Sequence, residues 1–218
     1  MPLTLANAAL KLNLRARRRH PAAARLPPLW LMTDAARLPD PITALDRLPR
    51  GAGIILRHYE GGLEAPERRA LAHELAARCR ARGLALLVAG SGRLAAEVGA
   101  DGLHLPEWLL MRGGIAGRWR RRRPDWLITA SCHREAMLRA AARAGADAAL
   151  VAPVFATASH PEVRPLGPLR LARMVRASPL PVFALGGIDA AGARRIGASG
   201  AAGIAGIGAV AARRCDHA

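Results

Sequence analysis

Short apolar segments alternate with longer amphipathic segments along most of the chain. Each apolar segment is bounded by Gly, Pro or Asp, a pattern typical of strands buried on both faces of a parallel sheet. The strands expected on this basis span residues 29–33, 53–57, 84–88, 102–105, 126–131, 148–152, 181–185 and 201–207. The helices expected between them span residues 41–48, 66–82, 93–98, 109–122, 134–144, 169–176 and 190–197.

Eight strands that alternate with helices predict a (β/α)8 TIM barrel, an α/β fold with a closed parallel sheet. The chain of 218 residues is long enough for one such domain, which we place at residues 29–212. The triplet Gly-Ala-Asp precedes two expected strands, at residues 99–101 and 145–147. This recurrence indicates an internal repeat of one βα unit. A doubly wound open sheet is the main alternative fold.

Residues 1–28 stand apart as a basic N-terminal extension. Leu5, Ala8 and Leu12 share one face of a short helix, and a basic run follows at residues 15–19. Prolines at positions 21, 27 and 28 then end any helix. We expect a helix or a frayed arm that lies outside the barrel. Its arginine-rich, acid-free composition also resembles a transit peptide.

Composition narrows the choice of partners. The net charge of +17 comes almost entirely from arginine, and Lys11 is the single lysine. A large excess of arginine over lysine is typical of a protein from a GC-rich genome. The positive charge alone therefore favours anionic partners only weakly. Aromatic residues make up 3% of the chain, which leaves little for base stacking and argues against a nucleic-acid partner.

Three cysteines, Cys79, Cys132 and Cys215, lie far apart without metal-ligand spacing. They indicate free thiols in a reducing compartment. The sequence has no apolar run long enough to span a membrane and no secretory signal pattern. We therefore expect a cytoplasmic protein without a membrane partner.

Polar side chains cluster after the expected strands. In a barrel of this type the active site lies at the carboxyl ends of the strands. Arg57 suits either a phosphate clamp or an ion pair with Asp34 or Glu60, and His133 could serve as an acid/base. His104, inside a strand, is expected to be packed or hydrogen-bonded. The remaining candidates after strands two, five and six are Tyr59, Ser131, Thr157, Ser159 and His160.

The segment 181–188 is an apolar strand that ends on two glycines and leads into a helix, with Asp189 placed to cap it. A weaker copy follows at residues 203–210. Glycine lets the backbone approach a ligand closely, and free N–H groups suit a phosphate. These two turns resemble the phosphate corner after strands seven and eight of a TIM barrel. The phosphate-binding candidates are Gly186, Gly187, Ile207 and Gly208, with Thr157 and Ser159 nearby.

Taken in order, several motifs resemble the thiamine phosphate synthase/TenI superfamily, over roughly residues 29–210. The segment 29–34 is similar to the opening strand of that family, and 54–57 to its Gln-Leu-Arg segment. Residues 99–105 read Gly-Ala-Asp-Gly-Leu-His-Leu, close to the Gly-Ala-Asp-Gly-Val-His-Leu of the family, and 131–133 resemble its Ser-x-His. The two glycine turns resemble its phosphate-binding strands.

The resemblance implies a barrel that binds the thiazole phosphate of thiamine biosynthesis. The synthase joins this thiazole to a pyrimidine pyrophosphate with the help of Mg²⁺. This chain departs from the synthase pattern at the pyrophosphate end: Ala89 and Gly90 replace its Asn-Asp pair, and Leu109 replaces its second Mg²⁺ aspartate. Further departures are Ile55 for Gln, Tyr59 for Lys and His160 for Lys.

The TenI-like thiazole tautomerases form a second branch, which moves a proton within the thiazole carboxylate phosphate and needs no metal. The resemblance places their acid/base histidine at His133. We therefore expect a tautomerase-like enzyme without a cofactor. One alternative is a noncanonical synthase that holds Mg²⁺ on Glu107 or Asp101. Another is a non-catalytic protein that binds a phosphorylated ligand or nucleic acid. The sequence leaves the oligomeric state open, a homo-oligomer included.

Overall fold

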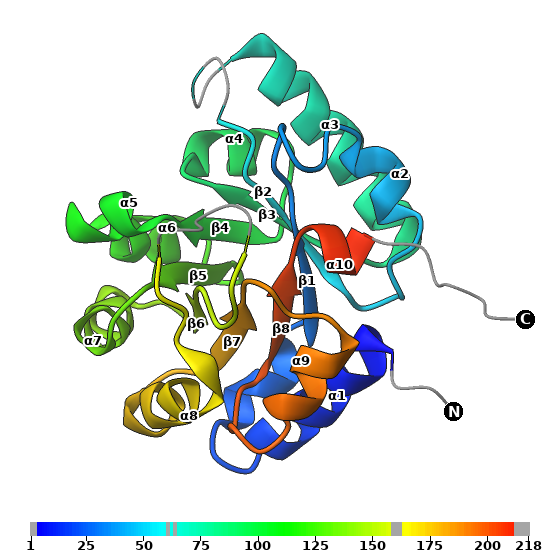
Figure 1. The fold of residues 1–218 in the computed structure, drawn as a ribbon. Helices are drawn as coiled ribbons and strands as arrows, with labels where there is room; N and C mark the ends of the chain where they lie inside the picture. Colours follow the sequence, from blue (N-terminus) through cyan, green and yellow to red (C-terminus); the bar gives the residue numbers. More distant parts are fainter. Residues whose placement is uncertain (1–3, 60–61, 63–64, 158–162, 212–218) are drawn as a thin grey trace, which may run out of the picture.

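The structure, a computed structural model, describes residues 4–59, 62, 65–157 and 163–211. Its strands form a closed barrel in which every neighbouring pair is parallel and β8 pairs with β1 (Figure 1). Both the α/β class and the (β/α)8 barrel expected from the sequence are confirmed. The strands are β1 (Leu29–Met32), β2 (Gly53–Leu56), β3 (Ala85–Ala89), β4 (Gly102–Leu105), β5 (Leu127–Cys132), β6 (Ala148–Val151), β7 (Val182–Leu185) and β8 (Gly203–Gly206).

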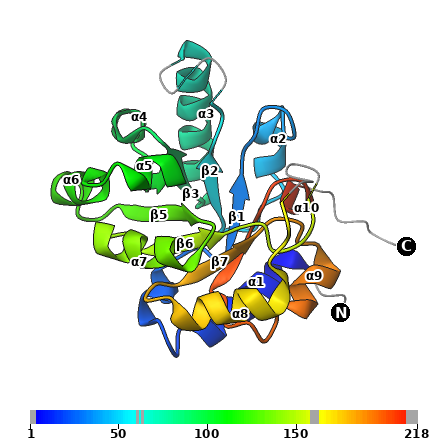
Figure 2. The ribbon, with the colours of Figure 1, turned by 60° about the vertical axis from the view of Figure 1, so that its left-hand side comes forward.

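Helices surround the barrel and cover the outward faces of the strands (Figures 1 and 2). None of the helices in the described ranges is long and apolar enough to cross a membrane. The helices are α1 (Leu5–Ala16), α2 (Pro41–Leu45), α3 (Pro66–Arg82), α4 (Gly92–Glu97), α5 (Glu107–Met111), α6 (Ile115–Arg122), α7 (Glu135–Ala144), α8 (Gly167–Ala177), α9 (Ala190–Arg195) and α10 (Gly208–Ala211), together with the 3-10 helix η1 (Pro21–Arg25).

The helix expected over residues 109–122 is two helices. Gly113 and Gly114 separate α5 from α6, with φ of 68° and 67°. Two consecutive residues in the left-handed region cannot continue a right-handed helix, and glycine is the residue that adopts this conformation most readily. The break ends α5, which contacts β4, before α6 begins.

Two large aromatic side chains fill the interior of the barrel. The rings of Trp30 and Phe183 meet edge to face at 84°, with 6.5 Å between their centroids. A β-carbon at Gly53 would overlap the Trp30 ring, and one at Gly203 would overlap Phe183. The two glycines therefore supply the space in which the aromatic rings pack.

The N-terminal segment does not lie outside the barrel as expected. Helix α1 packs against α9, β8 and β1 (Figure 1). Its face formed by Ala8, Ala9, Leu12 and Ala16 is buried, because an arm in water would leave this apolar surface exposed. The buried Asn13 amide donates to the backbone carbonyls of Ala23 (3.0 Å) and Ala202 (3.2 Å). The segment is thus part of the barrel domain.

The basic run that follows α1 bonds to the ends of two other helices. Arg15 donates to the carbonyl oxygen of Gly197, just beyond α9, at 2.8 Å. Arg19 donates to the carbonyl oxygen of Arg176, in the last turn of α8, at 2.5 Å. Carbonyls at helix C-termini lack helical partners and carry partial negative charge, so cationic side chains stabilise them. Part of the excess positive charge therefore has a structural use.

The repeated Gly-Ala-Asp triplet also has a structural explanation. Asp101 precedes β4, and its carboxylate accepts a hydrogen bond from the backbone N–H of Leu86 in β3 at 2.8 Å. Asp147 precedes β6, and its carboxylate accepts from Ile128 in β5 at 2.7 Å. In each case the aspartate pairs its strand with the preceding strand at the amino-terminal end of the barrel.

Candidate functional site

Arg57 follows β2 at the carboxyl-terminal end of the barrel. Its backbone N–H donates to Thr33 Oγ1 at 2.9 Å, and its guanidinium donates to Asp34 Oδ2 at 2.9 Å. Of the two roles that the sequence allowed, the structure contains the ion pair with Asp34. Arg37 also donates to Asp34, through its backbone N–H at 3.1 Å and its guanidinium at 2.7 Å. The hydrogen bond from Arg37, supported by Arg57, lowers the pKa of Asp34 to about 2.

The Tyr59 ring lies close to two guanidinium groups. The ring centroid is 5.9 Å from the guanidinium carbon of Arg57 and 5.9 Å from that of Arg68. Burial raises the pKa of the Tyr59 phenol, although both arginines act in the opposite direction. Tyr59 therefore presents a neutral phenol where the synthase pattern has a lysine.

Ser131 is held by a buried histidine. His104 Nε2 lies 2.9 Å from Ser131 Oγ, and its Nδ1 lies 2.8 Å from Thr129 Oγ1. Burial lowers the pKa of His104 to about 3, so the ring is neutral. The expectation that His104 is packed and hydrogen-bonded is confirmed.

His133 lies between β5 and α7, and about half of its side chain is exposed. Its Nδ1 is 3.0 Å from the carbonyl oxygen of Ala152. A carbonyl only accepts, so Nδ1 carries the proton of the neutral ring and Nε2 has the free lone pair. Glu107 Oε2 lies 3.6 Å from Nε2, and Glu107 Oε1 lies 3.4 Å from the Arg134 guanidinium. The site thus contains an oriented imidazole beside a carboxylate.

The pairing of Glu107 with His133 was not anticipated from the sequence, where Glu107 was considered only as a metal ligand. One signal was present. Glu107 follows β4 and His133 follows β5, and adjacent parallel strands bring residues just beyond their ends together.

The two glycine turns form one side of a pocket of about 490 Å³. Gly186 and Gly187 have φ of 95° and 65°. A β-carbon at Gly187 would also overlap the carbonyl oxygen of Ala156. Glycine is thus required here both for conformation and for space. The residues predicted to bind phosphate that line this pocket are Gly186, Gly187, Ile207, Gly208 and Thr157.

Two charged side chains also line this pocket, Asp189 and Arg37. Asp189 caps α9 as expected, since its Oδ1 accepts from the backbone N–H of Gly192 at 2.7 Å. Arg37 was not anticipated, because nothing in the loop after β1 indicates which way its side chain points. Ser159 and His160, the other candidates in the loop after β6, lie outside the described residues.

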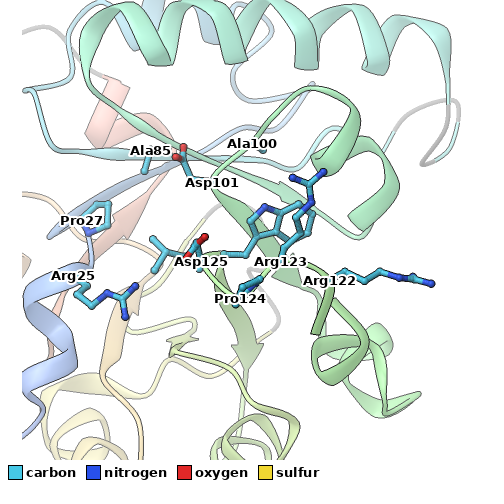
Figure 3. Close-up of a pocket in the computed structure, with 11 residues that line it drawn as sticks. Arg25, Pro27, Ala85, Ala100, Asp101, Arg122, Arg123, Pro124 and Asp125 are labelled. Carbon is cyan, nitrogen blue, oxygen red and sulfur yellow. The ribbon is translucent and has the colours of Figure 1, made fainter. Parts of the chain in front are cut away.

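A second cavity, of about 660 Å³, opens at the opposite end of the barrel (Figure 3). Asp101 and Arg25 line it together with the loop before β5, and Arg122 points away from the other charged side chains. Asp101 precedes β4, so it lies at the amino-terminal end and cannot join a metal site at the carboxyl-terminal rim. The sequence-based alternative that placed Mg²⁺ on Asp101 was therefore wrong.

The described residues at the carboxyl-terminal rim of the barrel do not fit the Mg²⁺ site that the resemblance implies for a synthase. Mg²⁺ takes oxygen ligands, mainly carboxylates, and the corresponding positions hold Ala89, Gly90 and Leu109, with Leu109 buried in the outer core. Within the described part of the chain, no three His, Cys, Asp or Glu side chains are grouped closely enough to hold a metal ion. Glu107, the nearest acid, lies beside His133 and Arg134.

Known proteins resemble this chain in both sequence and fold. The bifunctional protein ThiM/ThiE of Symbiobacterium thermophilum is 35% identical over 173 residues, which cover 79% of this chain and 35% of that protein. The chain thus spans about a third of that relative. The putative thiamine-phosphate synthase 2 of Aquifex aeolicus is 31% identical over 164 residues, which cover 75% of this chain and 86% of that protein.

A solved structure with a related name also resembles this chain. Thiamine phosphate pyrophosphorylase from Pyrococcus furiosus superposes with a TM-score of 0.67 at 26% identity, covering 85% of this chain and 88% of that one. The family model described as thiamine monophosphate synthase, TMP-TENI, matches residues 36–210. This range contains the strands from β2 to β8, the glycine turns and His133. The chain therefore belongs to the thiamine monophosphate synthase (TMP-TENI) family.

Proposed function

We propose that this protein binds a thiazole phosphate and isomerises it by moving a proton with His133. The observation that carries the proposal is the orientation of the imidazole. The carbonyl of Ala152 fixes the proton on Nδ1, which leaves Nε2 as a base at the rim of the barrel. Proton transfer requires a positioned acid/base and an anchor for the substrate, and it requires no metal.

The anchor is the pocket lined by the two glycine turns. Its lining residues include the glycines of both turns, Thr157 and Arg37, and main-chain N–H, hydroxyl and guanidinium groups together suit a phosphate ester. In the proposed reaction Nε2 takes a proton from one position of the bound thiazole, and the imidazolium returns a proton to another. Glu107, 3.6 Å from Nε2, stabilises the imidazolium between these steps. The molecular formula of the substrate is unchanged.

A second candidate is thiamine phosphate synthesis, the joining of a thiazole phosphate to a pyrimidine pyrophosphate with release of pyrophosphate. The names of the relatives support this reaction better than the isomerisation, since they include thiamine-phosphate synthases from several bacteria. The positions that would bind Mg²⁺ in such an enzyme hold Ala89, Gly90 and Leu109. This candidate therefore needs a way to stabilise the departing pyrophosphate without those ligands.

One assay separates the two reactions. The purified full-length protein is incubated with the thiazole carboxylate phosphate alone, and separately with thiazole phosphate, pyrimidine pyrophosphate and Mg²⁺. Isomerisation in the first mixture supports the main proposal. Mg²⁺-dependent formation of thiamine phosphate in the second supports synthesis instead. Binding of the thiazole phosphate without turnover in either mixture would make the protein non-catalytic.

The role of His133 is tested by His133→Asn, with His73→Asn as the matched control. The two imidazoles have similar exposure, 53% and 55%, and each lies beside a glutamate, but His73 belongs to α3 on the outside of the barrel. His133→Asn should abolish isomerisation and keep binding of the phosphorylated thiazole. His73→Asn should turn over like the native protein. Unchanged turnover in His133→Asn would remove His133 from the mechanism.

A further inference from the structure

Arg37 brings a cationic side chain to the pocket at the two glycine turns. The other lining residues are small, apolar or hydroxyl-bearing, apart from the carboxylate of Asp189. Without Arg37, a phosphate in this pocket would meet main-chain N–H groups, the Thr157 residue and one negative side chain. A guanidinium adds the charge and the paired donors that bind phosphate oxygens in a bidentate manner.

Asp34 holds Arg37 in place. The carboxylate accepts from the backbone N–H of Arg37 and from its guanidinium, at 3.1 and 2.7 Å. The backbone of the same turn is closed by a hydrogen bond from the N–H of Leu38 to the carbonyl oxygen of Asp34, at 2.7 Å. The turn after β1 is therefore pinned at its start, and the Arg37 guanidinium is held on Asp34 beside the pocket.

Asp34 is shared with Arg57. Oδ2 lies 2.7 Å from the Arg37 guanidinium and 2.9 Å from that of Arg57. If the Arg37 guanidinium turns toward a ligand, the carboxylate keeps Arg57 as its partner, so no charge is left unpaired. The Arg37 side chain is 36% exposed, against 31% for Arg57, and Arg37 is the one of the two that lines the pocket.

We propose that Arg37 binds the phosphate group of the ligand in this pocket and favours a phosphorylated ligand over its unphosphorylated counterpart, and that Asp34 is its positioning residue. The inference deepens the proposed function and rests on it for the choice of a thiazole phosphate as ligand. It gives the pocket a charged donor supplied by the loop after β1, in addition to the main chain of the glycine turns.

The test measures binding by the full-length protein of inorganic phosphate, of thiazole phosphate and of the same thiazole without its phosphate. Arg37→Ala should weaken binding of both phosphates by roughly tenfold or more, the size expected for a lost charge-assisted hydrogen bond. Binding of the unphosphorylated thiazole should not change. Arg37→Lys keeps the charge and loses the paired donors, so its affinity should be intermediate. Asp34→Asn should weaken phosphate binding less than Arg37→Ala does.

Arg18→Ala is the matched control, because it removes one exposed arginine beyond the C-terminal end of α1. It should bind all three ligands like the native protein. Equal phosphate affinity in native protein and Arg37→Ala would overturn the inference, as would an equal loss in Arg18→Ala. Phosphate binding that depends on Arg37 in a protein that turns over no thiazole would refute the proposed function and leave this inference standing.

Discussion

The imidazole of His104 and the hydroxyl of Ser131 lie side by side within the barrel, with 2.9 Å between Nε2 and Oγ. A neutral imidazole has one N–H and one lone pair, and Thr129 occupies the other nitrogen. His104 therefore donates to one hydroxyl and accepts from the other. This arrangement fixes a side chain of the candidate site from inside the barrel.

The neutral His104 makes stability depend on pH. Burial lowers its pKa from 6.5 to about 3, so the unfolded chain takes up a proton below pH 6.5 that the folded protein does not. The stability that the neutral His104 ring contributes is fully present above pH 6.5 and is lost as pH falls toward 3. His104→Gln removes this titration. Urea unfolding at several pH values should show a shallower acidic decline for the variant, and equal declines would contradict the assignment.

Gly53 is expected to be intolerant of alanine. A β-carbon there overlaps the Trp30 ring, and an overpacked core typically loses about 1–3 kcal/mol of unfolding free energy. Gly117, in α6, is the control, because its nearest neighbour would be the Arg121 guanidinium at 3.7 Å. Gly117→Ala should be neutral or stabilising by up to about 1 kcal/mol. Denaturant unfolding measures both, and similar values for the two variants would contradict the packing described for Trp30.

The attachment of α1 depends on Asn13. Asn13→Leu leaves the carbonyls of Ala23 and Ala202 without their side-chain donor, so we expect a loss of about 1–3 kcal/mol. Asn7→Ala changes an exposed asparagine of the same helix and should be nearly neutral. Hydrogen exchange should also show faster exchange in α1 of Asn13→Leu. Native protection in that variant would mean that apolar packing alone holds the helix.

The glycine turns permit a test that separates ligand binding from folding. Gly208 has open space where a β-carbon would be built, and Gly187 does not. Gly208→Val should weaken binding of inorganic phosphate with little change in melting temperature. Gly187→Ala should lower both, since its φ of 65° also disfavours a side chain. Native phosphate affinity in Gly208→Val would indicate that ligands do not reach that turn.

The described cysteines should be unreactive in the folded protein. Burial raises the pKa of the Cys79 thiol and of the Cys132 thiol to about 12, so the thiolate that reacts with alkylating reagents is scarce at neutral pH. In a Cys215→Ser variant, which leaves these two thiols, labelling by iodoacetamide should be slow until urea unfolds the chain. Rapid labelling under native conditions would show that one of the thiols is accessible.

The sequence predicts the barrel well because its signals are local. Each strand is a short apolar segment with a breaking residue at its end, as at Gly186 and Gly187, and its length and flanking residues identify it. The location of α1 could not be predicted in this way. Its apolar face indicates burial against something, but only the closed barrel supplies the surface formed by β8 and α9.

Contacts between the loops of the candidate site could not be predicted from local sequence patterns either. The pairing of Glu107 with His133 depends on how two successive loops fold over the strand ends, and the orientation of Arg37 depends on the hydrogen bonds of Asp34. Asp101 illustrates the opposite case, in which residues close in sequence lie far apart in the structure. It is close in sequence to Glu107, yet β4 lies between them, so the two acids are at opposite ends of the barrel.

The packing of α1 against β8 and α9 has a consequence for synthesis of the protein on the ribosome. Helix α1 is made well before α9 and β8, because its contacts with the region around Gly197 and Ala202 lie more than 180 residues further along the chain. Until α9 and β8 are made, the apolar face of α1 lacks part of the surface that covers it in the folded protein, and exposed apolar surface promotes aggregation. A nascent chain stalled before β8 thus leaves this apolar face of α1 partly exposed.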